Sequence, residues 1–308
     1  MKKHIVCLSF DFDALSIWIS RGMTTPLPIS RGEFGVIGAR RILALLDRFG
    51  IKATWFVPGH TAETFPDAAL EIHHAGHEIG NHSWTHQSPL AMSRDQEREE
   101  LLRASQALKR LTGNYPLGYR SPVWDASENT IDLLLENGFR YASNGMANDY
   151  SPYRARVGDV ITMYEPAKFG RTTPLIEIPV SWSLDDAPHF EVVRTPNWIQ
   201  PGLSNAGLVA DNWMADFDYM RDHVDWGVLT YTFHPYCIGR GHRMVALEKL
   251  ISHLQADRGG PIAPANKNGH PKVTALIGDL QRALQIAPRL CFLHRRNDRA
   301  RQRGLQLR

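Results

Sequence analysis

The sequence is poor in cysteine and lacks long apolar runs. Its three cysteines, Cys7, Cys237 and Cys291, stand far apart and form no CxxC pair. This spacing excludes a disulfide framework and is typical of a reducing compartment. No segment approaches the roughly 18 apolar residues of a transmembrane helix. The apolar run Ile5–Phe10 ends at Asp11 and is shorter than the roughly 7–15 residues of a signal-peptide core. We therefore expect a cytoplasmic protein.

A basic surface for nucleic acid is also missing from most of the chain. The net charge is +3, but residues 282–308 hold eight Arg and one Asp, so the first 281 residues carry a net charge of −4. The basic character therefore belongs to the C-terminal end, and basic ends are usually solvated. We expect neither nucleic acid nor a membrane as a partner.

Short apolar segments alternate with amphipathic ones along residues 4–143. Strands are expected at residues 4–10, 52–57, 78–82, 117–121 and 139–143, and helices at 35–50, 65–76, 93–113 and 127–138. The third helix has Ser93 and Gln96 spaced as a capping box and Gly113 as its stop. This rhythm predicts an α/β fold in which helices surround a parallel sheet or barrel.

The second half of the chain has a weaker pattern. Residues 144–206 are rich in Pro, Asn and Asp, and we expect long loops around one strand at 175–182. A helix at 207–224, a strand at 227–233 and a helix at about 242–256 follow. We expect one catalytic domain over 1–256 and an atypical C-terminal tail over 257–308, with a weak helix near 274–286 as its one expected element.

Two carboxylates follow the first predicted strand. Residues i and i+2 of a strand point to the same face, so Asp11 and Asp13 face the same way at the carboxyl end of the strand. Active sites of parallel α/β barrels lie at that end. Two carboxylates this close need neutralisation, and a metal ion is a common solution. An Asx turn after the strand is the alternative explanation.

Histidines form the second candidate cluster. His82 and His86 are four residues apart, so one helical turn would place both imidazoles on one side. Together with one aspartate they would form a two-His, one-carboxylate metal site with open positions, which leaves the other aspartate free as a base. His73, His74 and His77 are equally metal-like by spacing, but they fall in an apparent helix, and a structural role is the more common one for His73 and His74.

Three further segments carry candidate groups. Arg120 follows a predicted strand and could hold a carboxylate, although a surface arginine is the simpler explanation. The segment SWSLDD contributes Trp182, Asp185 and Asp186. His234 ends an apolar strand, where it is either packed in the core or placed to donate the proton that a leaving amine requires.

These segments occur in an order that resembles the polysaccharide deacetylase family, also called carbohydrate esterase family four. The resemblance covers about residues 4–256 and rests on SFDFDA, TWFVPGH, GHEIGNHSWTH, GYRSP and TFHP. Segments such as RGEFG and YSPYRARVGD look like its cytoplasmic, allantoinase-like and peptidoglycan-deacetylase-like branch. The resemblance implies a distorted (β/α) barrel of about seven parallel strands and a hydrolase of carbon–nitrogen bonds other than peptide bonds.

The resemblance also implies a role for each candidate residue. It gives the roles of base to Asp11, metal ligands to Asp13, His82 and His86, orienting arginine to Arg120, acid to His234, partner of that acid to Asp185 or Asp186, and pocket walls to Trp124 and Trp182. The implied cofactor is a divalent metal ion, zinc by expectation. The family barrel normally closes with a further strand and helix, which residues 257–308 do not show. They are either a divergent tail or the product of a shifted reading frame.

Three functions are compatible with these residues. The first expectation is a metal-dependent hydrolase of a small amide, cyclic amide or imide, because polymer deacetylases usually need export to reach their substrate. The alternative is an N-deacetylase of N-acetylated amino sugars or peptidoglycan, and a catalytically silent carbohydrate-binding module is the third. We also expect a homo-oligomer in which the long loops of residues 144–206 contribute to a neighbouring subunit, because loops of this length are usually functional.

Overall fold

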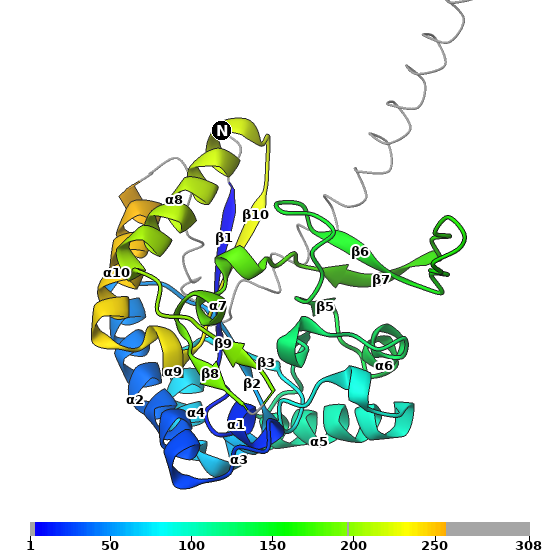
Figure 1. Cartoon of the computed structure of the whole chain (residues 1–308), viewed down its shortest axis with the longest axis horizontal. Helices are drawn as coiled ribbons and strands as arrows, with labels where there is room; N and C mark the ends of the chain where they lie inside the picture. The colour runs from blue at the N-terminus through cyan, green and yellow to red at the C-terminus, as the bar shows by residue number, and fades with distance from the viewer. Residues whose placement is uncertain (1–3, 196, 257–308) are drawn as a thin grey trace, which may run out of the picture. The chain divides into compact units, whose positions relative to one another are not determined.

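An eight-stranded sheet forms the centre of the computed structural model, which describes residues 4–195 and 197–256 (Figure 1). The strand order is β10-β1-β2-β3-β4-β5-β7-β6, and all neighbours pair in parallel except β7 and β6. The strands are β1 (Ile5–Asp11), β2 (Thr54–Val57), β3 (Glu78–Asn81), β4 (Gly118–Tyr119), β5 (Tyr141–Ala142), β6 (Tyr153–Val157), β7 (Arg171–Glu177) and β10 (Val228–Phe233). The predicted barrel of about seven parallel strands is confirmed as a curled sheet that forms a half-barrel.

Helices follow most of the parallel strands and lie outside the sheet (Figure 1). The longer ones are α2 (Pro26–Arg48), α3 (Gly59–Thr64), α4 (Pro66–His74), α5 (Arg94–Thr112), α6 (Thr130–Glu136), α8 (Ala206–His223) and α10 (Gly241–Ala256). Short helices α1 (Ser16–Ser20), α7 (Asp186–Phe190) and α9 (Pro235–Ile238) follow β1, β7 and β10. The start and stop predicted for α5 are confirmed, since Ser93 and Gln96 form a capping box and Gly113 is left-handed at φ 82°.

The apolar core lies between the sheet and this outer layer of helices. On β1, Leu8 and Phe10 belong to the core, and Phe10 stacks on Trp55 of β2 with ring centroids 4.7 Å apart. Alternation along the strand turns the intervening side chains the other way, into the barrel. Ser9 and Asp11 therefore face the interior, where the hydroxyl of Ser9 donates to the carbonyl of Tyr231 at 2.7 Å.

A glycine on α2 lets this helix pass close to the segment after β10. A Cβ built on Gly38 would lie 2.0 Å from the carbonyl oxygen of Pro235, so any other residue would push the two segments apart. Because Pro235 directly follows His234, the contact fixes the chain on which that imidazole stands.

The expectation of long loops around one strand at 144–206 is wrong. Strands β6 and β7 form an antiparallel pair (Figure 1), and β7 ends at Glu177, short of the predicted end at residue 182. Two short strands, β8 (Val193–Arg194) and β9 (Ile199–Gln200), pair with each other further on. Pro174 lies inside β7, where the register against β6 is irregular, and it gave the segment the pattern of a loop.

Two sequence-based expectations reach beyond the described residues. The C-terminal tail and its weak helix near 274–286 fall outside them, so the division at residue 256 stays a prediction. Within the described part of the chain, no helix combines the length and the apolar character needed to cross a bilayer.

Candidate active site

Asp11 and Asp13 meet two imidazoles at the carboxyl end of β1. Asp11 is the last residue of the strand, and Asp13 follows before Ala14, whose φ is 47°. The Nε2 atom of His82 lies 3.3 Å from Oδ1 of Asp13 and 3.8 Å from Oδ2 of Asp11. His86 Nε2 lies 3.7 Å from Oδ2 of Asp13. The structure therefore brings all four predicted side chains together.

Asp13, His82 and His86 fit a divalent cation. One ligand atom from each lies within 4.8 Å of the others. Both carboxylate oxygens of Asp13 and Nε2 of His82 are buried and make no hydrogen bond among the described residues. The other ring nitrogen of His82, Nδ1, lies 2.7 Å from the carbonyl oxygen of Arg120. If Nδ1–H donates to that oxygen, the lone pair of Nε2 faces the carboxylates, and a cation between them satisfies all three groups.

The charges around this cluster also favour a bound cation. Burial works to raise the pKa of Asp13, but His86, His82 and His234 outweigh it and hold the pKa well below its usual range. Burial lowers the pKa of His86 to about 4, with the opposing effect of Asp13 too weak to restore it. Burial also works to lower the pKa of His82, but Asp11 and Asp13 raise it overall. The site thus combines an ionised carboxylate with a neutral imidazole and favours added positive charge.

The helical turn that we expected between His82 and His86 is absent. Residues 82–88 form no helix, and Ser83 and His86 have φ values of 60°. The two rings nevertheless come within 5.0 Å, centroid to centroid. The four-residue spacing thus predicted the right neighbours for the wrong reason, because a tight loop with left-handed residues replaces the helix.

Glu100 on α5 fixes the loop between His82 and His86 through hydrogen bonds. Its Oε2 atom accepts hydrogen bonds from the hydroxyl of Ser83, the amide of Trp84, and the amide and hydroxyl of Thr85, at 3.2 to 3.4 Å. Left-handed backbone in a residue other than glycine is unfavourable and persists where surrounding contacts fix it. Glu100 supplies such contacts, and no motif in the sequence pointed to it.

Arg120 is fully buried and connects Asp11 to the far side of the barrel. Its Nη1 atom donates to Oδ1 of Asp11 at 2.7 Å and to the hydroxyl of Ser9 at 2.9 Å. Its Nη2 and Nε atoms donate to the hydroxyl and the carbonyl of Ser143, and its guanidinium lies 4.3 Å from the ring centroid of Phe56. These contacts orient Asp11, with its Oδ1 atom bound by Arg120 and its Oδ2 atom on the side of His82. The simpler explanation of Arg120 as a surface residue is wrong.

His234 faces the same cavity, and the structure distinguishes its two candidate partners. Its Nδ1 atom lies 2.7 Å from Oδ1 of Asp186 but 3.6 Å from Oδ1 of Asp185, which instead caps α7 by accepting from the amide of Ala187. Its Nε2 atom lies 3.9 Å from Oδ2 of Asp11. Burial works to lower the pKa of His234, but Asp185 and Asp186 raise it well above the usual value. Asp186 is therefore the partner that orients His234.

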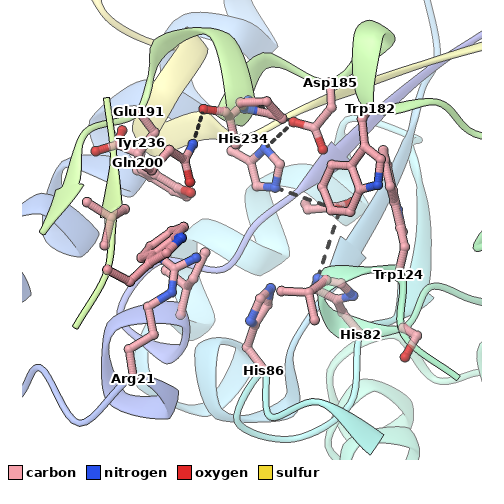
Figure 2. Close-up of a pocket in the computed structure, with 18 residues that line it drawn as sticks. Arg21, His82, His86, Trp124, Trp182, Asp185, Glu191, Gln200, His234 and Tyr236 are labelled. Atoms are coloured by element: carbon pink, nitrogen blue, oxygen red, sulfur yellow. Dashed lines mark hydrogen bonds and ion pairs between the residues drawn. The ribbon is translucent and has the colours of Figure 1, made fainter. Parts of the chain in front are cut away.

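A cavity of about 290 Å³ opens over these groups (Figure 2). Trp124 and Trp182 both line it, with ring centroids 4.4 Å apart. Val123 and Trp124 have φ values of 51° and 56°, and a β-branched residue such as valine adopts this conformation only where the fold requires it. The two tryptophans thus lie where the sequence analysis expected pocket walls.

Several lining residues were not among the predicted site residues. Arg21, Glu191, Gln200 and Tyr236 also line the cavity (Figure 2). Tyr236 lies two residues after His234 and could have been found from that motif. The others stand outside the motifs and reach the cavity only through the tertiary fold.

The alternative histidine cluster, His73, His74 and His77, takes no part in the candidate metal site. Nδ1 of the buried His77 accepts the amide proton of Ala53 at 3.1 Å, and burial lowers its pKa to about 4. His73 and His74 end α4 and take no part in the groups of described residues that could hold a metal. The contact with Ala53 gives His77 a structural role, and the structural explanation of His73 and His74 stays a prediction.

Comparison with known proteins identifies the family. The sequence model of the polysaccharide deacetylase family matches residues 36–142. The peptidoglycan deacetylase of Helicobacter pylori is 36% identical over 272 residues, which cover 84% of this chain and 92% of that protein. The chain belongs to the polysaccharide deacetylase family. It is therefore a hydrolase of carbon–nitrogen bonds other than peptide bonds.

Solved structures agree with this assignment. The crystal structure of a putative polysaccharide deacetylase from Mycobacterium smegmatis matches with a TM-score of 0.77 and 30% identity, covering 92% of this chain and 91% of that one. PuuE allantoinase matches with a TM-score of 0.68 at 24% identity, covering 85% and 87%. At this level of sequence identity, the similarity to PuuE allantoinase shows a shared fold only.

Proposed function

We propose that this deacetylase-family hydrolase removes acetyl groups from N-acetylated amino sugars of the peptidoglycan type. The observation that carries the reaction is the separation of roles in one cavity. Asp13, His82 and His86 form a set of ligands, while Asp11 and His234 are each held by a different partner. The amino-sugar substrate is supported by the likeness to a peptidoglycan deacetylase along 92% of its length. This is the alternative of the sequence analysis, and it now ranks above small cyclic amides.

Asp13, His82 and His86 would hold the metal ion. Zinc suits imidazole and carboxylate ligands, and hydrolysis requires no change of redox state. When bound, the ion supplies the Lewis acidity that activates water near neutral pH. Among the described residues, the other set with metal-like spacing is Asp185, Asp186 and His234, but hydrogen bonds within the protein already account for those carboxylates.

The chain's own residues move the protons. Asp11 accepts a proton from the attacking water, and Arg120 orients its carboxylate for this task. His234 is held by Asp186 through Nδ1, so Nε2 faces the cavity and donates a proton to the leaving nitrogen. The raised pKa of His234 keeps that proton available at neutral pH. Trp124 and Trp182 offer apolar faces on which sugar rings stack.

A substrate panel with measured metal content tests the proposal. Purified protein is incubated with N-acetylglucosamine oligomers, glycan fragments of peptidoglycan, allantoin and cyclic imides, and acetate or ring opening is quantified. We expect acetate release from the sugars and its loss after chelation. Turnover of allantoin or imides alone would overturn the substrate, and full activity without metal would overturn the role of the ion. Sugar binding with no turnover of any compound would favour the silent binding module.

Two further expectations accompany this proposal. A cytoplasmic location would make a glycan fragment or precursor the accessible substrate rather than the assembled wall. Cell fractionation with an antibody against the chain tests the location, and light scattering of the purified protein tests the expected homo-oligomer. Neither result bears on the chemistry of the cavity.

A further inference from the structure

One cationic side chain of the cavity has no function in the proposed reaction. Arg21 follows α1 directly and lines the cavity that contains His82, His86 and His234 (Figure 2). Its Nη1 atom is buried and makes no hydrogen bond to any described residue. Arg21 as a whole is partly exposed, but a buried nitrogen of a charged group that lacks a hydrogen-bond partner is costly, so this atom is placed to bind one.

The carboxylates that line the cavity do not provide that partner. Each is matched elsewhere: Asp11 with Arg120, Asp185 with the amide of Ala187, and Glu191 with Arg31. Arg21 is the one Arg or Lys side chain among the described lining residues. An anion that enters the cavity would therefore find the guanidinium of Arg21 uncommitted.

A purely structural role for Arg21 is less well supported. Its guanidinium lies 5.6 Å from the ring centroid of Trp18, but Arg31 covers the same ring at 4.3 Å.

The place of Arg21 suggests what it recognises. In Figure 2, Arg21 lies on one side of His82 and His86, and Trp124 and Trp182 lie on the other. A sugar packed on the tryptophans with its acetamido group near the imidazoles would direct a neighbouring substituent toward Arg21. Guanidinium groups bind carboxylates with charge-assisted, often paired hydrogen bonds.

We propose that Arg21 binds a carboxylate carried by the substrate next to its acetamido group. The favoured substrate is then an acidic amino sugar of the N-acetylmuramic type, whose lactyl ether stands on the carbon beside the acetamido-bearing carbon, rather than neutral N-acetylglucosamine. This inference rests on the proposed function and narrows its substrate class.

Rates with a matched pair of substrates test the inference. N-acetylmuramic acid and its methyl ester differ in the charge of one group, so the ratio of their kcat/KM values reports recognition of the carboxylate. We expect the acid to be preferred by roughly 10- to 100-fold, the range of a charge-assisted hydrogen bond. In Arg21→Gln the ratio should fall to about one. Arg194→Gln is the matched control, because Arg194 is exposed on β8 and does not line this cavity.

A binding measurement separates this inference from the proposed function. Muramic acid and its methyl ester, the deacetylated products, undergo no turnover, and calorimetry gives their affinities for the wild-type and Arg21→Gln proteins. Tighter binding of the acid that depends on Arg21 supports the inference even if no sugar is hydrolysed. Equal binding of acid and ester overturns it. So does inhibition by free acetate that requires Arg21 while acid and ester behave alike, because Arg21 would then bind the released acetate.

Discussion

Removal of the Glu100 side chain should weaken metal binding although Glu100 is not a ligand. In Glu100→Ala, the amides of Trp84 and Thr85 and two hydroxyl groups lose their acceptor. A hydrogen bond to a charged group contributes about 1.5–3 kcal/mol, and four that share one oxygen are not additive. We expect the fixed loop between His82 and His86 to lose about 2–4 kcal/mol of stabilisation. Loss of an outer partner of metal ligands typically lowers metal affinity by roughly 10- to 100-fold.

Metal affinity is the appropriate readout because it requires no turnover. Zinc is titrated into chelator-treated protein in competition with a chromophoric chelator, and the free energy of unfolding is measured in urea with and without zinc. Glu99→Ala is the matched control, since Glu99 is its exposed neighbour on α5. Glu100→Gln keeps one acceptor oxygen and should lie between wild type and Glu100→Ala.

Two results would refute this reasoning. Zinc affinity of Glu100→Ala equal to that of wild type would mean that the loop keeps its left-handed residues without Glu100. An equal loss in Glu99→Ala would place the effect on α5 as a whole rather than on the hydrogen bonds. In either case Glu100 would not be a positioning residue for His82 and His86.

Three other substitutions test the separation of roles and the charges of the interior. Asp11→Asn should abolish turnover and retain zinc, whereas His82→Ala should lose zinc; the reverse pattern would exchange the roles of base and ligand. Asp186→Asn removes a charge that raises the pKa of His234, so the alkaline fall of kcat should move to lower pH, and an unchanged profile would contradict the assignment of the acid. Burial raises the pKa of Glu177 to about 7, whereas the same group in the unfolded chain releases its proton near pH 4.5. The native state therefore binds one proton more than the unfolded chain between these pH values, and its stability falls as the pH rises. Relative to Glu177→Gln, wild type should lose about 3 kcal/mol of unfolding free energy between pH 4.5 and 7. Parallel urea titrations of the two proteins check this difference, and equal slopes would contradict it.

Local signals predicted the elements that carry the chemistry. Leu8 and Phe10 alternate with Ser9 and Asp11, and successive side chains of a strand point to opposite faces. This alternation predicts which side chains enter the barrel. Ser93 and Gly113 mark the ends of α5 through hydrogen bonds and backbone conformation that depend on neighbouring residues alone. Such features are decided within a few residues, and the sequence is sufficient for them.

Other features depend on contacts between distant segments. Asp185 and Asp186 are chemically identical, and the start of α7 alone decides that the first caps the helix and the second meets His234. Glu100 and Arg21 belong to no motif, and each acquires its place through the packing of its helix against the barrel. No spacing rule could have predicted either residue.

The burial of Arg120 limits how this catalytic site can change. One guanidinium joins β1, the segment after β5 and the ring of Phe56, so the same atoms that orient Asp11 also cross-link the interior of the barrel. Replacement of Arg120 alone would leave the buried carboxylate of Asp11 without its cation, so a change at position 120 requires compensating changes in the residues that it contacts. New substrate preferences should therefore arise by changes at the rim, around Arg21, Trp124 and Trp182, while the centre of the barrel stays as it is.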